Sequence, residues 1–179
     1  PLTFAFTIRN QVVGGLAVIR ASIAEKNSLL EMRKEFFAVS KEQAAKSLVK
    51  GYVFGDPNDQ TRTNAFLEKL LLHRIDVYET PNSNYYVPTN QDNHIMVRTI
   101  FENQITYKDS SFYDASVWSL IQAYGLPYSE AKTALTPGKK LERIPDVVLN
   151  EVNKSNYAYL VSNTDYNIHQ FIYELEQGG

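Results

Sequence analysis

Few side chains of this sequence belong to the types that carry enzyme chemistry, and their spacing does not assemble a familiar catalytic set. Cysteine is absent, which excludes a thiolate nucleophile and thiolate metal ligands. The three histidines, His73, His94 and His169, lie far apart in the sequence. None has a second histidine or a glutamate at the close spacing of a hydrolytic zinc site. We therefore expect each histidine to have a structural role.

Motifs for phosphate and calcium are also incomplete. Gly51 and Gly55 bracket an apolar segment, but neither a glycine-rich phosphate loop nor a nucleophile elbow follows it. Residues 56–59 collect oxygen ligands, yet the turn is too short for an EF-hand loop and lacks the closing glutamate. We predict that this turn caps the helix that follows it.

The densest group of candidate binding residues lies in the segment 107–118, which mixes carboxylates, hydroxyls and aromatic rings. Aromatic side chains beside carboxylates suit the recognition of a sugar or a peptide. The candidate ligand-binding residues are Asp109, Tyr113, Asp114 and Trp118. The alternative, which the pattern favours, is a packed loop in which Asp114 or Ser116 caps the next helix and Trp118 joins the core. A further alternative is an independent enzyme with Asp109 and Asp114 as general acid and base.

Composition limits the class of protein. The 179 residues are 44% hydrophobic and 21% charged, as in a folded protein of one domain or one domain with an appendage. The formal net charge of -2 argues against nucleic-acid binding and gives no reason to expect an anionic membrane as partner. No apolar run approaches the roughly 20 residues that span a bilayer, so membrane insertion is not expected. The 12 tyrosines would suit an interface and leave a homodimer open.

Apolar periodicity predicts the elements that would position these residues. Over residues 3–46 the spacings of three, four and seven predict helix. The apolar positions of its first half are Ile8, Val12, Leu16, Ile19 and Ile23. Strands are expected at 51–55, 75–78, 85–88 and 157–161, and helices at 61–74, 94–101, 116–124 and 167–177. Strand, helix and strand in quick order predict a βαβ unit in a parallel sheet, and the proline of the third strand favours an edge position.

Several ordered blocks, which span nearly the whole chain, resemble the C-terminal region of large M14-type zinc carboxypeptidases of Bacteroidetes. The blocks are residues 4–11 (FAFTIRNQ), 50–56 (KGYVFGD), 86–91 (YVPTNQ), 112–118 (FYDASVW) and 123–127 (AYGLP). In that family a domain similar to class I glutamine amidotransferases follows a catalytic peptidase domain. The resemblance implies a three-layer, flavodoxin-like, mostly parallel α/β sheet over residues 47–179. Truncation of this domain at its C-terminal end is left open. Residues 1–46 would be a helical tail of the upstream peptidase domain, or a linker from it.

The resemblance brings no catalytic residue into this chain. The zinc ligands and the catalytic glutamate would lie upstream of Pro1, so zinc is expected in that upstream domain alone and no cofactor here. The amidotransferase nucleophile is a cysteine, which this chain lacks. We therefore expect a non-catalytic accessory domain that docks on or regulates its peptidase domain or binds a partner, in a periplasmic or extracellular protein. The alternative is a ligand-binding module that keeps an amidotransferase-like pocket at the carboxyl ends of the strands.

Overall fold

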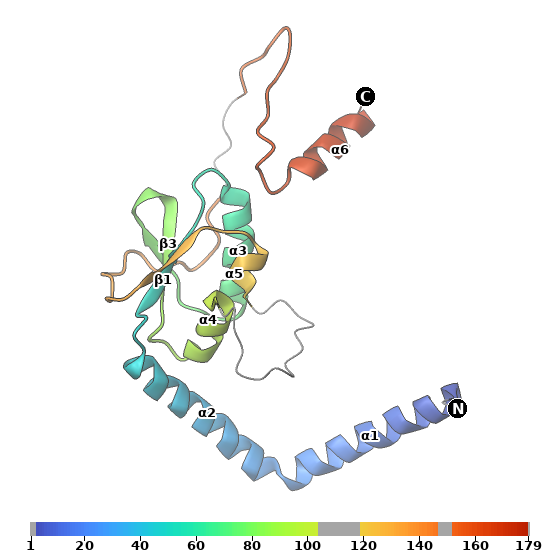
Figure 1. Cartoon of the computed structure of the whole chain (residues 1–179). Coiled ribbons are helices and arrows are strands. Elements are labelled where there is room, and N and C mark those ends of the chain that lie inside the picture. Colours follow the sequence, from blue (N-terminus) through green and yellow to red (C-terminus); the bar gives the residue numbers. More distant parts are fainter. Residues whose placement is uncertain (1–2, 104–118, 147–151, 179) are drawn as a thin grey trace.

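The structure is a computed structural model, and it describes residues 3–103, 119–146 and 152–178. The helices are α1 (Phe4–Ala24), α2 (Lys26–Lys46), α3 (Gln60–Leu72), α4 (His94–Phe101), α5 (Leu120–Ala123) and α6 (Ile168–Gly178). The strands are β1 (Gly51–Phe54), β2 (Tyr78–Thr80), β3 (Asn84–Pro88) and β4 (Tyr128–Ala131), with a 3-10 turn, η1, at Pro81–Ser83. We call α1 with α2 the arm, and the described residues between 47 and 146 the body. Figure 1 shows the arm and α6 extending from the body.

The four strands form one sheet in the order β2-β3-β1-β4, and every neighbouring pair is antiparallel. In the central ladder Tyr52 of β1 lies opposite Val87 of β3, and on its other side opposite Glu130 of β4. The predicted mostly parallel, flavodoxin-like sheet is therefore wrong.

The reason lies in how the chain returns after α3. Strands β1 and β2 run in the same direction, since each is antiparallel to β3, but β3 is inserted between them. The turn at Pro81–Ser83 is far too short for a parallel crossover and forces β3 back antiparallel to β2. The edge position predicted for the third strand is also wrong, because Pro88 ends β3 rather than interrupting it.

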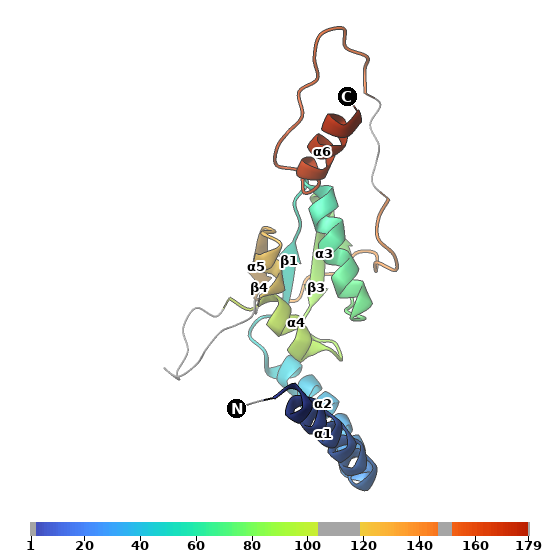
Figure 2. The same cartoon turned by 90° about the vertical axis from the view of Figure 1, so that its right-hand side faces the viewer.

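Helices α3, α4 and α5 lie together on one face of the sheet, in front of the strands in Figure 2. This arrangement gives two layers, so the predicted three-layer architecture is wrong as well. The core between the layers is rich in aromatic rings. Phe101, at the end of α4, stacks on Tyr52 with ring centroids 4.6 Å apart and lies 5.5 Å from Phe54 and 5.7 Å from Phe66.

Local signals account for the helix boundaries. Asp59 caps α3, because its Oδ1 accepts a hydrogen bond of 2.9 Å from the Arg62 N–H, so the predicted capping turn is confirmed. Helix α4 has the bounds predicted for it. The predicted helix over residues 3–46 is confirmed as two helices that meet at Glu25. No helix in the described ranges is long and apolar enough to cross a membrane.

One predicted strand begins later than expected, and another is absent from the described residues. The backbone of Asp76, within the predicted strand 75–78, pairs with the Gln91 side chain, whose Oε1 accepts from the Asp76 N–H at 2.8 Å. Consequently β2 begins only at Tyr78. Residues 157–161 are exposed and form no strand. The C-terminal segment instead returns to the body where Arg62 Nη2 donates to the Thr164 carbonyl at 3.0 Å.

Candidate docking surface

The four residues proposed from the sequence as ligand contacts, Asp109, Tyr113, Asp114 and Trp118, lie outside the residues that the structure describes. The same holds for the acid–base pair suggested from Asp109 and Asp114.

The histidines lie in three separate places. His73 follows the last turn of α3 and is exposed, and His169 is exposed on α6. His94 begins α4 and is buried, with its Nδ1 2.8 Å from the Thr89 carbonyl oxygen. Within the described ranges, no three His, Asp or Glu side chains are grouped so that they could hold a metal ion.

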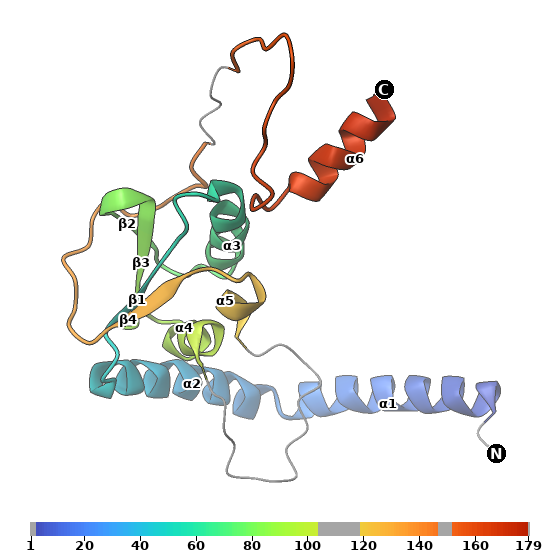
Figure 3. The same cartoon turned by 45° about the horizontal axis from the view of Figure 1, so that its top comes forward.

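The most unusual surface belongs to the arm. No residue of α1, all of which the structure describes, is buried. Five apolar residues nevertheless recur at spacings of three and four and therefore share one side of this helix, which we call the arm stripe. The arm stripe consists of Ile8, Val12, Leu16, Ile19 and Ile23, which are between 48% and 73% exposed. Figure 3 shows that α1 extends past the body from its junction with α2.

The arm stripe continues the side of α2 that packs on the body. Leu30, Phe37 and Ala44 follow Ile23 at intervals of seven residues. Ala44 is buried against the body and Phe37 is half-buried, whereas Leu30 is 47% exposed. The contact is anchored by Ser40, whose hydroxyl donates to the Asp92 carbonyl at 3.0 Å. One apolar pattern is thus covered at its C-terminal end and uncovered over the rest of the arm.

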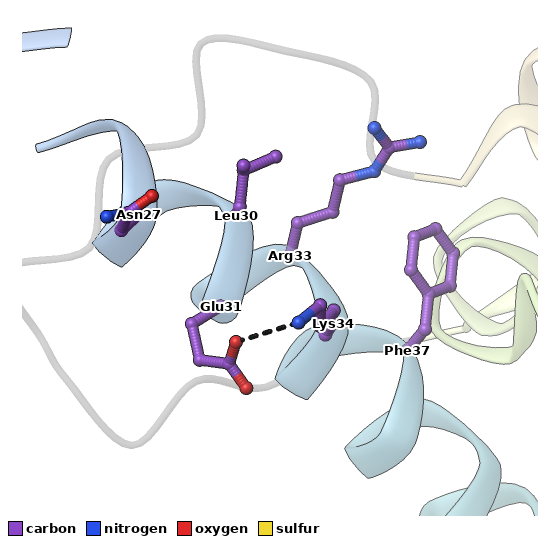
Figure 4. A pocket seen from close by; sticks show the side chains of 6 residues that line it. All are labelled: Asn27, Leu30, Glu31, Arg33, Lys34 and Phe37. Atoms are coloured by element: carbon purple, nitrogen blue, oxygen red, sulfur yellow. Dashed lines mark hydrogen bonds and ion pairs between the residues drawn. The ribbon is translucent and has the colours of Figure 1, made fainter. Parts of the chain in front are cut away.

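The charges of the arm differ between its two helices. Helix α1 carries Arg9 and Arg20 and contains no acidic residue. Helix α2 carries both signs, and its Glu31 and Lys34 form an exposed ion pair of 3.0 Å. Figure 4 shows this pair at the edge of a shallow hollow of about 520 Å³, whose described lining comes entirely from α2.

Sequence periodicity identified the arm stripe as one side of a helix but did not show that it lacks a cover. That property depends on which other segments of the chain pack on it, and the structure places none of the described ones there. Comparison of the chain with protein-family models, curated proteins and solved structures finds no match.

Proposed function

We propose that this chain is a non-catalytic docking module that holds another folded domain through the arm stripe. The observation that carries the proposal is the uncovered continuation of an apolar pattern that already packs on the body at Ala44. Contiguous exposed apolar surface of this kind marks protein–protein contact in soluble proteins. Its occupant is a domain whose own surface is apolar, with carboxylates placed to meet Arg9 and Arg20.

The composition of α1 supports a need for such a partner. Gly14 and Gly15 lie in the middle of this 21-residue helix, and each disfavours helix by about 1 kcal/mol relative to alanine. An isolated helix of this length is marginal in water, and helices in proteins are held mainly by packing of their apolar side. The Thr3 cap, whose Oγ1 accepts from the Phe6 N–H at 3.3 Å, assists its N-terminal end. Packing on a partner would therefore provide the stability that the helix propensity of α1 does not.

The expected strength follows from the exposed fractions. Full burial of a Val, Leu or Ile side chain contributes about 1.5–3 kcal/mol. The five stripe residues are 48–73% exposed, so covering them should contribute about 1 kcal/mol each. A total of about 5 kcal/mol corresponds to between three and four orders of magnitude in affinity, before the costs of association.

The partner we propose is the peptidase domain that the family resemblance implies upstream in the same polypeptide. The first block of that resemblance, residues 4–11, lies within α1 and includes the stripe residue Ile8. A domain joined directly to α1 would have a high effective concentration at the arm, so a modest contact area would suffice.

The test compares amide hydrogen exchange of α1 in residues 1–179 alone and in a polypeptide that also contains the upstream domain. We expect fast exchange in the first and slow exchange in the second. Leu16→Asp should remove the protection, because it places a carboxylate inside the apolar contact. The matched control is Gln11→Asp, which adds the same charge to α1 away from the stripe and should preserve the protection.

Equal exchange of α1 in the two polypeptides would contradict the proposal, as would equal effects of the two substitutions. Protection that appears in residues 1–179 alone and grows with protein concentration would assign the stripe to a second copy of this chain and overturn the proposed partner.

A further inference from the structure

A second feature of the body is unrelated to the arm stripe and lies on the sheet face opposite the core. Residues 132–138, which we call the strap, connect β4 at one edge of the sheet to the flank of β2 at the other. The far end of the strap is fixed by the Glu79 N–H, which donates to the Lys139 carbonyl at 2.9 Å. Figure 3 shows this segment leaving β4 and passing beside β2. The chain therefore crosses this face without a helix to fill the space beneath.

Between the strap and the sheet lies a hollow of about 380 Å³, within the size range of small-molecule sites. Tyr78, Tyr86 and Pro88 of the sheet line one side of it. Leu135 and Pro137 of the strap line another. Small side chains at the end of α2 line a further side of the hollow. The lining is thus mostly apolar, with flat rings on two sides.

The sheet side of the hollow is rigid. Tyr86 is only 2% exposed, and its ring lies over Gly51, where any Cβ atom would come within 2.2 Å of it. The Tyr86 hydroxyl donates to the Lys50 carbonyl at 3.1 Å, and the Thr89 N–H donates to the same oxygen at 3.0 Å. The ring and the backbone beside it are therefore held in place before any ligand arrives, which lowers the entropic cost of binding.

Two polar side chains, Lys50 and Asn90, line the same hollow. Lys50 takes part in none of the ion pairs formed among the described residues. Within the same part of the chain, its Nζ has one long hydrogen bond, of 3.5 Å, to the Ala45 carbonyl. An ammonium group beside aromatic and proline rings suits an anion that carries a flat apolar group.

We propose that the hollow beneath the strap binds a small carboxylate with an aromatic group. Lys50 and Asn90 hold the carboxylate, and the ring lies between Tyr78 and Pro137. The site lies on a sheet face rather than at the strand ends, so it differs from the amidotransferase-like pocket considered from the sequence. It is also independent of the docking function proposed for the arm.

The test titrates residues 1–179 with phenylacetate and follows the amide resonances of Gly51 and Leu135 by NMR. We expect saturable shifts at both. Phenylacetamide has the same ring but no charge, so it cannot form the charge-assisted contact. We expect its affinity to be lower than that of phenylacetate by on the order of tenfold or more. Lys50→Gln should weaken phenylacetate binding by on the order of tenfold or more.

The matched control is Lys46→Gln, which removes an exposed lysine of α2 that does not line the hollow and should leave the affinity unchanged. Absence of saturable shifts would overturn the proposal. Equal binding of phenylacetate and phenylacetamide to the unaltered chain would overturn it too, and this comparison needs no variant to fold. Equal affinities of the Lys50 and Lys46 variants would remove Lys50 from the site and refute the proposed ligand class.

Discussion

Replacing Phe101 by alanine should test whether the aromatic cluster is the core of the body. Phe101 is 1% exposed and packs against Tyr52, Phe54 and Phe66 at centroid distances between 4.6 and 5.7 Å. Truncation of a buried phenylalanine costs about 3–5 kcal/mol in transfer free energy and cavity formation. These aromatic partners place Phe101 near the upper end of that range, since each such pair contributes about 0.5–1.5 kcal/mol beyond buried area. We therefore expect a loss of about 4–5 kcal/mol in the free energy of unfolding.

The assay is urea unfolding followed by circular dichroism, with Phe36→Ala as control. Phe36 is 49% exposed on α2, and its one ring partner among the described residues is Phe37, 5.5 Å away on the same helix. This variant should lose about 1 kcal/mol or less, although the same atoms are deleted. A loss below about 1 kcal/mol for Phe101→Ala would refute the assignment of the core. Equal losses for the two variants would mean that the arm is packed within this chain, which would refute the reasoning behind the docking surface.

Three further predictions concern single residues of the body. Arg74, at the end of α3, has a φ of 56°, so Arg74→Gly should raise the free energy of unfolding by about 1 kcal/mol in urea titrations. Asp59→Ala removes the cap of α3 and should lower it by about 1–2 kcal/mol, whereas Asp59→Asn keeps an acceptor and should recover most of the loss. Burial raises the pKa of Tyr52 above its ordinary value of 10.0, so its contribution to stability is complete below that pH and falls as the pH rises towards the raised pKa. Urea midpoints measured between about pH 8 and 11 should therefore decline less in Tyr52→Phe.

Local patterns in the sequence predicted the helices well because their signals are contained within a few residues. Helix α4 places Val97, Ile100 and Phe101 at the i, i+3, i+4 spacing of one buried side, so its type and bounds could be read directly. The order of the strands could not be read in this way, because strand pairing is a contact between distant segments. The turn at Pro81–Ser83 is short enough for an antiparallel connection alone, and in the structure this constraint outweighs the strand–helix–strand order.

The predicted strands failed where alternating apolar residues found partners other than a ladder. Ile75 and Val77 are buried in the core, as their pattern implied. The backbone of Asp76, between them, pairs with the side chain of Gln91 instead of with another strand. The apolar run at 157–161 has strand-forming residues but no described strand beside it to pair with, and it remains exposed. Intrinsic preference thus indicated which segments could form strands, but not which other segments they would pack against.

The two proposed sites differ in the same respect. The arm stripe is a single helical repeat, visible in the sequence. The hollow beneath the strap combines residues from α2, the segment before β1, β2, β3 and the strap, with no local signal. The end of α2 lies between them, because Ala44 holds the arm on the body and also lines the hollow. A substitution at Ala44 would change both the placement of the arm and the hollow, so it could not separate the two functions. Leu16 and Lys50 lie on either side of this junction, so their variants can separate loss of docking from loss of ligand binding.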